Sequence, residues 1–188
     1  MITTNKNIID LAPILSEEFI EYELPIEKIR EYQRFYDSRK DSIGILGTYL
    51  LQQMHDCEIV SVNKNESTID IELNDISFWI KHKDTHKKEN FSELKFPFHL
   101  RLINVNQFSI NDVSENGEII EIEDYNLIGA EVMNDQLIHF DKERIDLALT
   151  IWKYSESESN YKLVLISAEK IDIIEKQEEV LSKLINKQ

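Results

Sequence analysis

The sequence predicts an α+β protein whose main part is a predominantly antiparallel, bent β-meander, with helices at the N-terminus and one helix at the C-terminus. Near the N-terminus, apolar residues recur at helical spacing, and from Cys57 onward they alternate with polar residues instead. The alternating segments are short and are joined by polar turns, which is typical of an antiparallel sheet. We therefore expect one domain over 1–188, with a mainly helical part at 1–56, the sheet at 57–174 and the last helix at 176–188.

The N-terminal part predicts up to three helical elements. Pro25 suits the first turn of a helix, and apolar side chains then recur at helical spacing up to Tyr36. A second helix is expected over about 42–54, although two glycines oppose it. A shorter element is expected earlier, at about 14–22.

The first two strands predict a β-hairpin. Ile69, Ile71 and Leu73 alternate with polar residues, and the polar turn 64–67 joins them to the strand 58–62. Further strands are expected at 76–81, 96–103, 120–122, 128–132, 144–152, 161–166 and 171–174. The last of these is expected only if residues 167–170 continue the chain as a link and do not cap a helix.

Several residues predict where strands begin, end or become central. Asn116–Gly117 and Asn134–Asp135 are typical turn sequences. Pro97 indicates the start of a strand or an edge, because proline cannot donate to a ladder. The segment 161–166 is apolar on both faces, which favours a central strand.

The charge of the chain restricts its partners. The net charge is −15, from 36 acidic and 21 basic residues. Such a surface repels phosphate backbones and anionic membranes and attracts basic proteins, so we expect neither nucleic-acid nor membrane binding. The N-terminus lacks a signal-peptide pattern, no apolar run is long enough to span a membrane, and the lone Cys57 cannot form an internal disulfide. We therefore expect a cytoplasmic location.

Histidines and the cysteine were the candidates for chemistry. His55-Asp56 resembles a metal-binding pair, but a strand follows directly, so the pair is expected to cap a helix end. His82 and His86 have the i, i+4 spacing of zinc ligands on a helix, yet they lie in a lysine-rich polar segment. Cys57 could be a nucleophile near His55, but a cysteine that opens a strand is more often buried. We therefore expect no metal and no cofactor.

Two groups of residues are candidates for an interface. Trp79 and Trp152 fall on the polar phase of their strands, where they either form an interface or are covered by the helices. Glu118, Glu121, Glu123 and Asp124 flank a predicted turn. They either contact a basic partner or form a solvated strand face.

The segment from Met54 to Val62, with the sequence MHDCEIVSV, carries a resemblance. It resembles uncharacterised bacterial proteins in which a Leu-His-Asp-small-x-Ile junction joins a helix to a sheet, with Met54 here in place of leucine. The resemblance covers about 49–174 and implies the fold above. Some of those proteins are found among toxin-immunity genes, so the resemblance also implies an immunity or inhibitor function.

No catalytic motif in the sequence identifies a function. Three hypotheses therefore remain: a non-enzymatic acidic binding protein of the immunity or inhibitor type, a small hydrolase with a dispersed histidine and carboxylate site, and a homo-oligomeric housekeeping scaffold, such as a homodimer. The sequence favours the first, in which the protein is not an enzyme and its partner is a basic protein.

Overall fold

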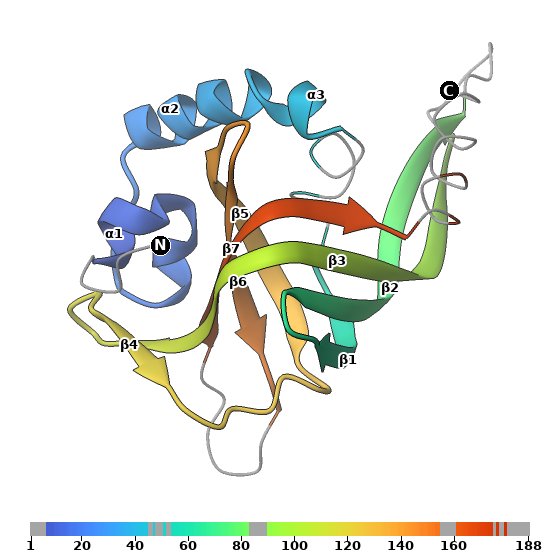
Figure 1. Cartoon of the computed structure of the whole chain (residues 1–188). Coiled ribbons are helices and arrows are strands. Elements are labelled where there is room, and N and C mark those ends of the chain that lie inside the picture. The colour runs from blue at the N-terminus through green and yellow to red at the C-terminus, as the bar shows by residue number, and fades with distance from the viewer. Residues whose placement is uncertain are drawn as a thin grey trace.

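The computed structural model describes residues 7–44, 47, 51, 54–82, 90–154, 161–174, 176 and 179, without the side chains of 75–82 and 90–96. It contains one antiparallel sheet of seven strands with a few short helices, which confirms the α+β class (Figure 1). The helices are α1 (Ile8–Leu11), the 3-10 helix η1 (Pro13–Glu18), α2 (Ile26–Asp37) and α3 (Lys40–Ile43). The strands are β1 (Cys57–Lys64), β2 (Thr68–His82), β3 (Asn90–Val113), β4 (Ile119–Ile122), β5 (Glu131–Phe140), β6 (Ile145–Trp152) and β7 (Lys162–Ile173).

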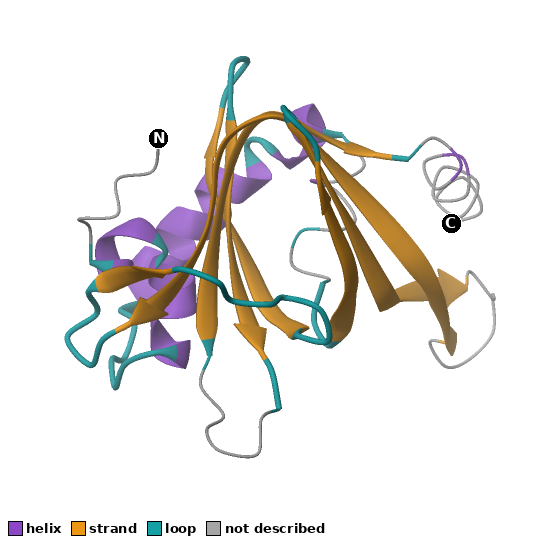
Figure 2. Ribbon diagram, turned by 60° about the horizontal axis from the view of Figure 1, so that its bottom comes forward, coloured by secondary structure: helices purple, strands orange, loops and turns teal. Residues whose placement is uncertain are grey.

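The sheet curls until it closes on itself. Its strand order is β2-β1-β5-β6-β7-β3-β4, and β2 also pairs with β3. Six strands therefore form a closed ring, and β4 extends the sheet beyond β3 (Figures 1 and 2). The contact between β1 and β5 is short and joins Cys57 to Val132 and Glu58 to Glu131. The bend expected from the sequence is thus strong enough to bring distant strands together.

Strands β2 and β3 are longer than the sequence predicts. The expected strands at 69–73 and 76–81 form one strand, interrupted by a register shift between Leu73 and Ile76. Pro97 lies opposite this shift, and pairing with β7 begins only at Leu100. The proline is therefore tolerated inside β3, because its missing N–H falls where the ladder is interrupted. The prediction that a strand starts at Pro97 is wrong, but the alternative of an edge agrees with the structure, because the residues on either side of Pro97 pair with β2 alone.

The predicted turn at Asn134–Asp135 is also wrong. Both residues lie within β5, next to a register shift that follows Val132. Asp135 is 6% exposed. Pairing with β6 overrides the turn preference of these two residues. The only irregularity beside them is the register shift in the ladder.

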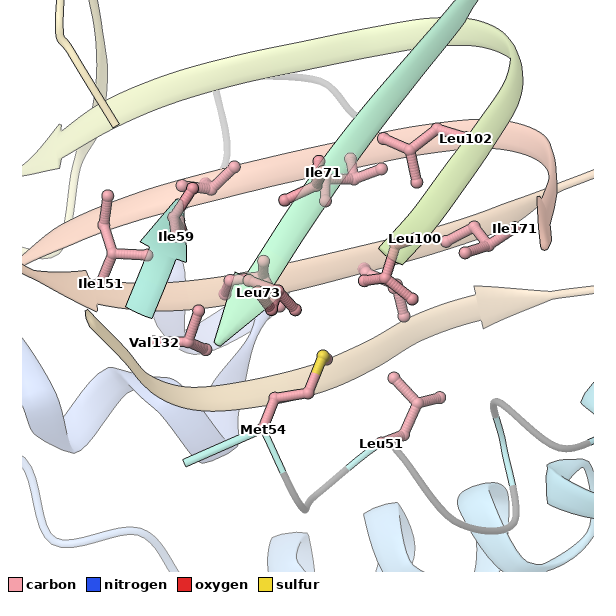
Figure 3. Packing of buried hydrophobic residues seen from close by; sticks show 14 of the residues in the cluster. Leu51, Met54, Ile59, Ile71, Leu73, Leu100, Leu102, Val132, Ile151 and Ile171 are labelled. Carbon is pink, nitrogen blue, oxygen red and sulfur yellow. The ribbon is translucent and has the colours of Figure 1, made fainter. Parts of the chain in front are cut away.

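The interior of the ring is the main hydrophobic core. All six strands of the ring contribute to it, together with Leu51 and Met54 (Figure 3). On β6, Leu147, Leu149 and Ile151 belong to this core, while Ala148 packs in a second cluster. Each fully buried aliphatic side chain stabilises the fold by about 1.5–3 kcal/mol. The expected strand 144–152 is confirmed as β6, which begins one residue later and is buried on both faces.

The second cluster lies where the N-terminal helices pack on the outer face of β6 and β7. Ile8, Leu11 and Leu15 belong to one buried cluster with Leu163 and Leu165, which accounts for the apolar character of both faces of β7. The expectation that 161–166 is a central strand is confirmed, because β7 lies between β6 and β3.

Asn7 fastens this helical layer to the turn before β4. Its Oδ1 accepts the N–H of Ile9 at 3.0 Å, and its Nδ2 donates to the carbonyl of Asn116 at 2.7 Å. The N–H of Ile8 donates to the carbonyl of Gly117 at 2.8 Å. One residue therefore caps α1 and positions the β3–β4 turn at the same time.

The remaining helix predictions differ in outcome. The helix that follows Pro25 is confirmed as α2, and η1 covers part of the expected short element. Helix α3 ends at Gly44, whose φ is 76°, and most of the expected helix 42–54 lies outside the described residues. The expected C-terminal helix 176–188 lies outside them as well, apart from 176 and 179. Within the described part of the chain, no helix has the length and apolar character needed to cross a membrane.

Candidate functional site

Strand β4 is the last strand of the sheet order and pairs with β3. The turn that joins them is closed by two backbone hydrogen bonds, from Gly117 to the carbonyl of Ser114 at 2.8 Å and from Ser114 to the carbonyl of Glu118 at 2.9 Å. Gly117 has a φ of 79°, which a glycine adopts without strain. The turn predicted at Asn116–Gly117 is therefore confirmed, and it sets the position of β4.

The four acidic candidates all lie on or beside β4, and we call them the acidic edge. Their side chains are exposed, and none forms an ion pair with another residue that the structure describes. Ile120, in the middle of the strand, is 52% exposed. The acidic edge thus combines concentrated negative charge with an exposed apolar side chain. Its members are Glu118, Glu121, Glu123 and Asp124.

Basic residues near this part of the sheet are engaged elsewhere. Lys162 pairs with Asp112, with 2.5 Å between Nζ and Oδ1. Lys153 donates to the carbonyls of Asn126 and Ile128, at 3.2 and 2.6 Å. One lysine therefore neutralises a carboxylate on β3, and the other fastens the loop before β5.

The structure does not bring the tryptophans to the acidic edge. Trp152 pairs with Glu131 of β5, and two strands, β7 and β3, separate β6 from β4. On the outer face of β6, Ala148 packs with the helical layer and Thr150 is 0% exposed, whereas Trp152 is half-buried. Trp152 and the exposed Tyr154 form an edge-to-face pair with ring centroids 6.1 Å apart. Trp79 lies in β2, in the stretch whose side chains are not described.

The His55–Asp56 pair is a surface turn. The Nδ1 of His55 lies 2.8 Å from the Oδ2 of Asp56, and both side chains are more than half exposed. Asp56 has a φ of 59°, and its N–H donates to the carbonyl of Val132 at 2.8 Å. Strand β1 begins directly afterward, at Cys57. The pair thus occupies the junction that leads into β1.

The zinc candidates fall outside the side chains that the structure describes. His82 is the last residue of β2 and has no described side chain, and His86 lies outside the described residues. Among the residues that the structure describes, no group of three or more histidine, cysteine, aspartate or glutamate side chains is placed to hold a metal ion.

Cys57 is buried and engaged. Its Sγ contacts the carbonyl of Met54 at 3.0 Å, and the residue is 0% exposed. Burial, and then the charge of Asp135, raise the pKa of the thiol to about 12. Since the thiolate is the reactive form, this environment does not suit a nucleophile.

A second candidate place for function is an open cleft of about 1530 Å³, which is not lined by β4. It lies between the α2–α3 corner, the β5–β6 turn and β7. At its rim, the Nε2 of His139 lies 2.8 Å from the Oδ2 of Asp141. The other oxygen of Asp141 accepts the N–H groups of Glu143 and Arg144, at 2.8 and 2.9 Å. These backbone bonds, and then the contact with His139, lower the pKa of Asp141.

The charges of this cleft are balanced, unlike those of the acidic edge. Arg144 pairs with Asp146, whose side chain is 4% exposed, at 3.1 Å. Sequence reasoning missed His139 and Asp141, because the β5–β6 turn brings them together. The available signal was the turn preference of Asp141. The charged residues lining the cleft, besides His139, are Arg39, Lys142, Arg144, Lys170, Asp141, Glu143, Glu169 and Asp172.

The geometry thus offers two places for function, an acidic sheet edge and a balanced polar cleft. The edge unites the four predicted acidic residues, whereas the cleft contains none of the predicted site residues. Comparisons of the chain with protein-family models, with curated proteins and with solved structures find no match.

Proposed function

We propose that this protein is a non-enzymatic binding protein of the immunity or inhibitor type, which binds a basic partner protein through the acidic edge. The observation that carries the proposal is the set of four exposed carboxylates on or beside β4, unpaired among the described residues, on the strand that also carries the exposed Ile120. Protein interfaces commonly place an apolar centre inside a polar rim. β4 also presents apolar and charged side chains together, with the exposed Ile120 on one face and the exposed Glu121 on the other.

The charge of the whole chain supports the same proposal. With a net charge of −15, the molecule attracts a basic partner before contact, and the acidic edge concentrates that attraction at one place. Exposed charges are screened over about 8 Å at physiological ionic strength. Association with the partner is therefore fastest at low salt, and it slows as salt is added.

An alternative role for the acidic edge is protection of the sheet. Charged side chains on an exposed strand prevent edge-to-edge pairing with a second copy. Under that interpretation, removing the charges causes self-association and changes no other interaction. The homodimeric scaffold hypothesis is disfavoured at this edge, because two copies would bring like charges together.

The test is a pull-down from lysate of the native host, with wild-type protein and a variant in which all four residues of the acidic edge are changed to lysine. A matched control changes Glu23, Glu27, Glu31 and Glu66, which are exposed and lie away from β4, and it alters the net charge by the same amount. We expect the wild type and the control to retain a basic protein that the edge variant loses. Equal recovery by all three proteins would remove the acidic edge from consideration.

A second function, a small hydrolase, is favoured by one observation only. Asp141 fixes His139 at the rim of the cleft, so that the imidazole could accept a proton from a molecule bound there. The test is a panel of chromogenic ester and phosphoester substrates with the wild type, His139→Gln and Asp141→Asn. Turnover that both substitutions reduce at least tenfold would support this function. Absence of turnover by the wild type, or turnover that neither substitution changes, would count against it.

A further inference from the structure

We infer that the partner adds a β-strand to β4, and that the segment it presents has a basic residue between two apolar residues. This inference rests on the proposed function, because it describes how the acidic edge engages its partner. It follows from three features of β4: the direction of its backbone groups, the alternation of its side chains and its charge.

The backbone of β4 has polar groups directed away from the sheet. Ser114 donates to the carbonyl of Glu118, and Asp112 lies opposite Ile120. Because bonding alternates along an antiparallel ladder, Ile120 and Ile122 direct their N–H and C=O groups toward β3. Ile119 and Glu121 direct theirs away from it. The carbonyl of Gly117 has the same phase, and it accepts the N–H of Ile8 from outside the hairpin.

An outward row of this kind is a template for an incoming strand. Within the described part of the chain, Asn7 forms an isolated antiparallel bridge with Glu118, and no described residue pairs with the outer side of Ile120, Glu121 or Ile122. A strand added there would continue the ladder past Glu118. The outward N–H and C=O of Glu121 lie at the centre of the available stretch.

The side chains of β4 specify what such a strand carries. Ile120 and Ile122 lie on one face, and they are exposed and half-buried, respectively. Glu121 lies on the other face and is exposed. Directly opposite residues of neighbouring strands share a face and interact, so two apolar residues belong beside the isoleucines. A basic residue belongs beside Glu121, between those two.

Charge complementarity identifies the occupant as a basic segment of another protein. Glu118, Glu123 and Asp124 extend the negative charge on both sides of Glu121. A second copy of this chain would present the same carboxylates and would be repelled. A basic extended segment gains main-chain hydrogen bonds, apolar contact and charge pairing at the same time.

The experiment uses the full chain and a labelled heptapeptide, acetyl-Lys-Val-Lys-Val-Lys-Val-Lys-amide. A control peptide has the same composition, with lysines and valines in separate blocks. Binding is measured by fluorescence anisotropy for the wild type, Glu121→Gln and Glu121→Pro. Both variants lose the charge, but only proline also removes the outward N–H, and it removes no hydrogen bond to β3.

We expect the alternating peptide to bind the wild type at least tenfold more tightly than the block peptide. Glu121→Gln should weaken binding a few-fold, and Glu121→Pro at least tenfold more than Glu121→Gln. Equal losses in the two variants, or equal binding of the two peptides, would overturn strand addition. These results leave the proposed function intact, because that proposal fails only if reversal of the acidic edge leaves the native partner bound.

Amide hydrogen exchange of the wild type gives a readout that does not depend on how the proline variant folds. We expect the exchange of the Glu121 N–H to slow at least tenfold when the alternating peptide is added. Unchanged exchange would contradict strand addition. Exchange that is already slow without peptide would contradict it too, because the chain's own residues would then occupy the edge.

Discussion

Asp112 on β3 lies directly opposite Ile120 on β4, so that a carboxylate paired with a lysine faces the strand of the acidic edge. On the β3 side, Lys162 neutralises Asp112. On the β4 side, the carboxylates of the acidic edge have no ion pair with a described residue, and Ile120 is 52% exposed between them. Of these two strands, the outermost one therefore carries the carboxylates without an ion pair, where a partner can reach them.

The attachment of β4 depends on the close approach of Asn7 to Gly117. A Cβ at position 117 would lie 2.6 Å from the Oδ1 of Asn7, and Gly117 has a φ of +79°. Gly129 has a similar φ of +80°, but there a Cβ would meet only the Oε1 of Glu58, at 4.0 Å. We expect Gly129→Ala to cost about 1 kcal/mol from its backbone conformation alone, and Gly117→Ala to cost at least about 2 kcal/mol because strain and steric clash add. Urea denaturation measures the free energy of unfolding of both variants. Equal costs would show that the Asn7 side chain moves away from position 117 without an energetic penalty.

Cys57 should behave as an inert core residue. Burial raises its pKa to about 12, so very little thiolate is present at pH 8. We expect a disulfide reagent to label the native protein only at the rate of unfolding, and to label the urea-unfolded protein at once. Fast labelling of the native protein would restore Cys57 as a candidate nucleophile.

The Asp70–Arg101 pair on β2 and β3 should make stability depend on acidic pH. Arg101 donates to both oxygens of Asp70, at 2.7 and 2.9 Å, and this hydrogen bonding lowers the pKa of Asp70. The folded pKa is below the unfolded one. The contribution to stability is therefore present above the unfolded value of about 4, and it is lost as the pH falls through the folded value.

For a partly exposed pair, this contribution is at most about 1 kcal/mol. Asp70→Asn should therefore lower the free energy of unfolding at pH 7 and flatten its decline between pH 5 and pH 2. Asp124→Asn is the control, because Asp124 is exposed and forms no ion pair with a described residue. If Asp70→Asn and Asp124→Asn gave the same pH profile, the pair would contribute nothing to stability.

Local patterns predicted strands well and long-range pairings poorly. The alternation from Arg144 to Trp152 predicted β6 to within one residue, because the period of the side chains depends only on neighbouring residues. Closure of the ring depends on β2 pairing with β3 and on the two-residue contact between β1 and β5. No local period encodes these partners. Asn134 and Asp135 misled the prediction for the same reason, since their ladder to β6 decides their conformation.

The candidate sites show the same contrast between features encoded by neighbouring residues and features that depend on long-range contacts. The acidic edge was predictable, because its four residues are close in sequence and flank a strong turn signal. The pair His139–Asp141 was not, because a turn and a register shift between Leu137 and His139 bring the side chains together. The packing of α1 and η1 on Ala148 of β6 depends on how the helices dock, which no local pattern encodes.

The most direct test of the central proposal is the association rate with the basic protein recovered from the native host. It should be measured at low and high salt for the wild type, the lysine variant of the acidic edge and the matched control at Glu23, Glu27, Glu31 and Glu66. We expect the edge variant to lose at least tenfold in association rate at low salt, together with most of the salt dependence, while the control loses much less. If the edge variant and the control change equally, the overall charge and not the acidic edge governs binding, and the proposal is contradicted.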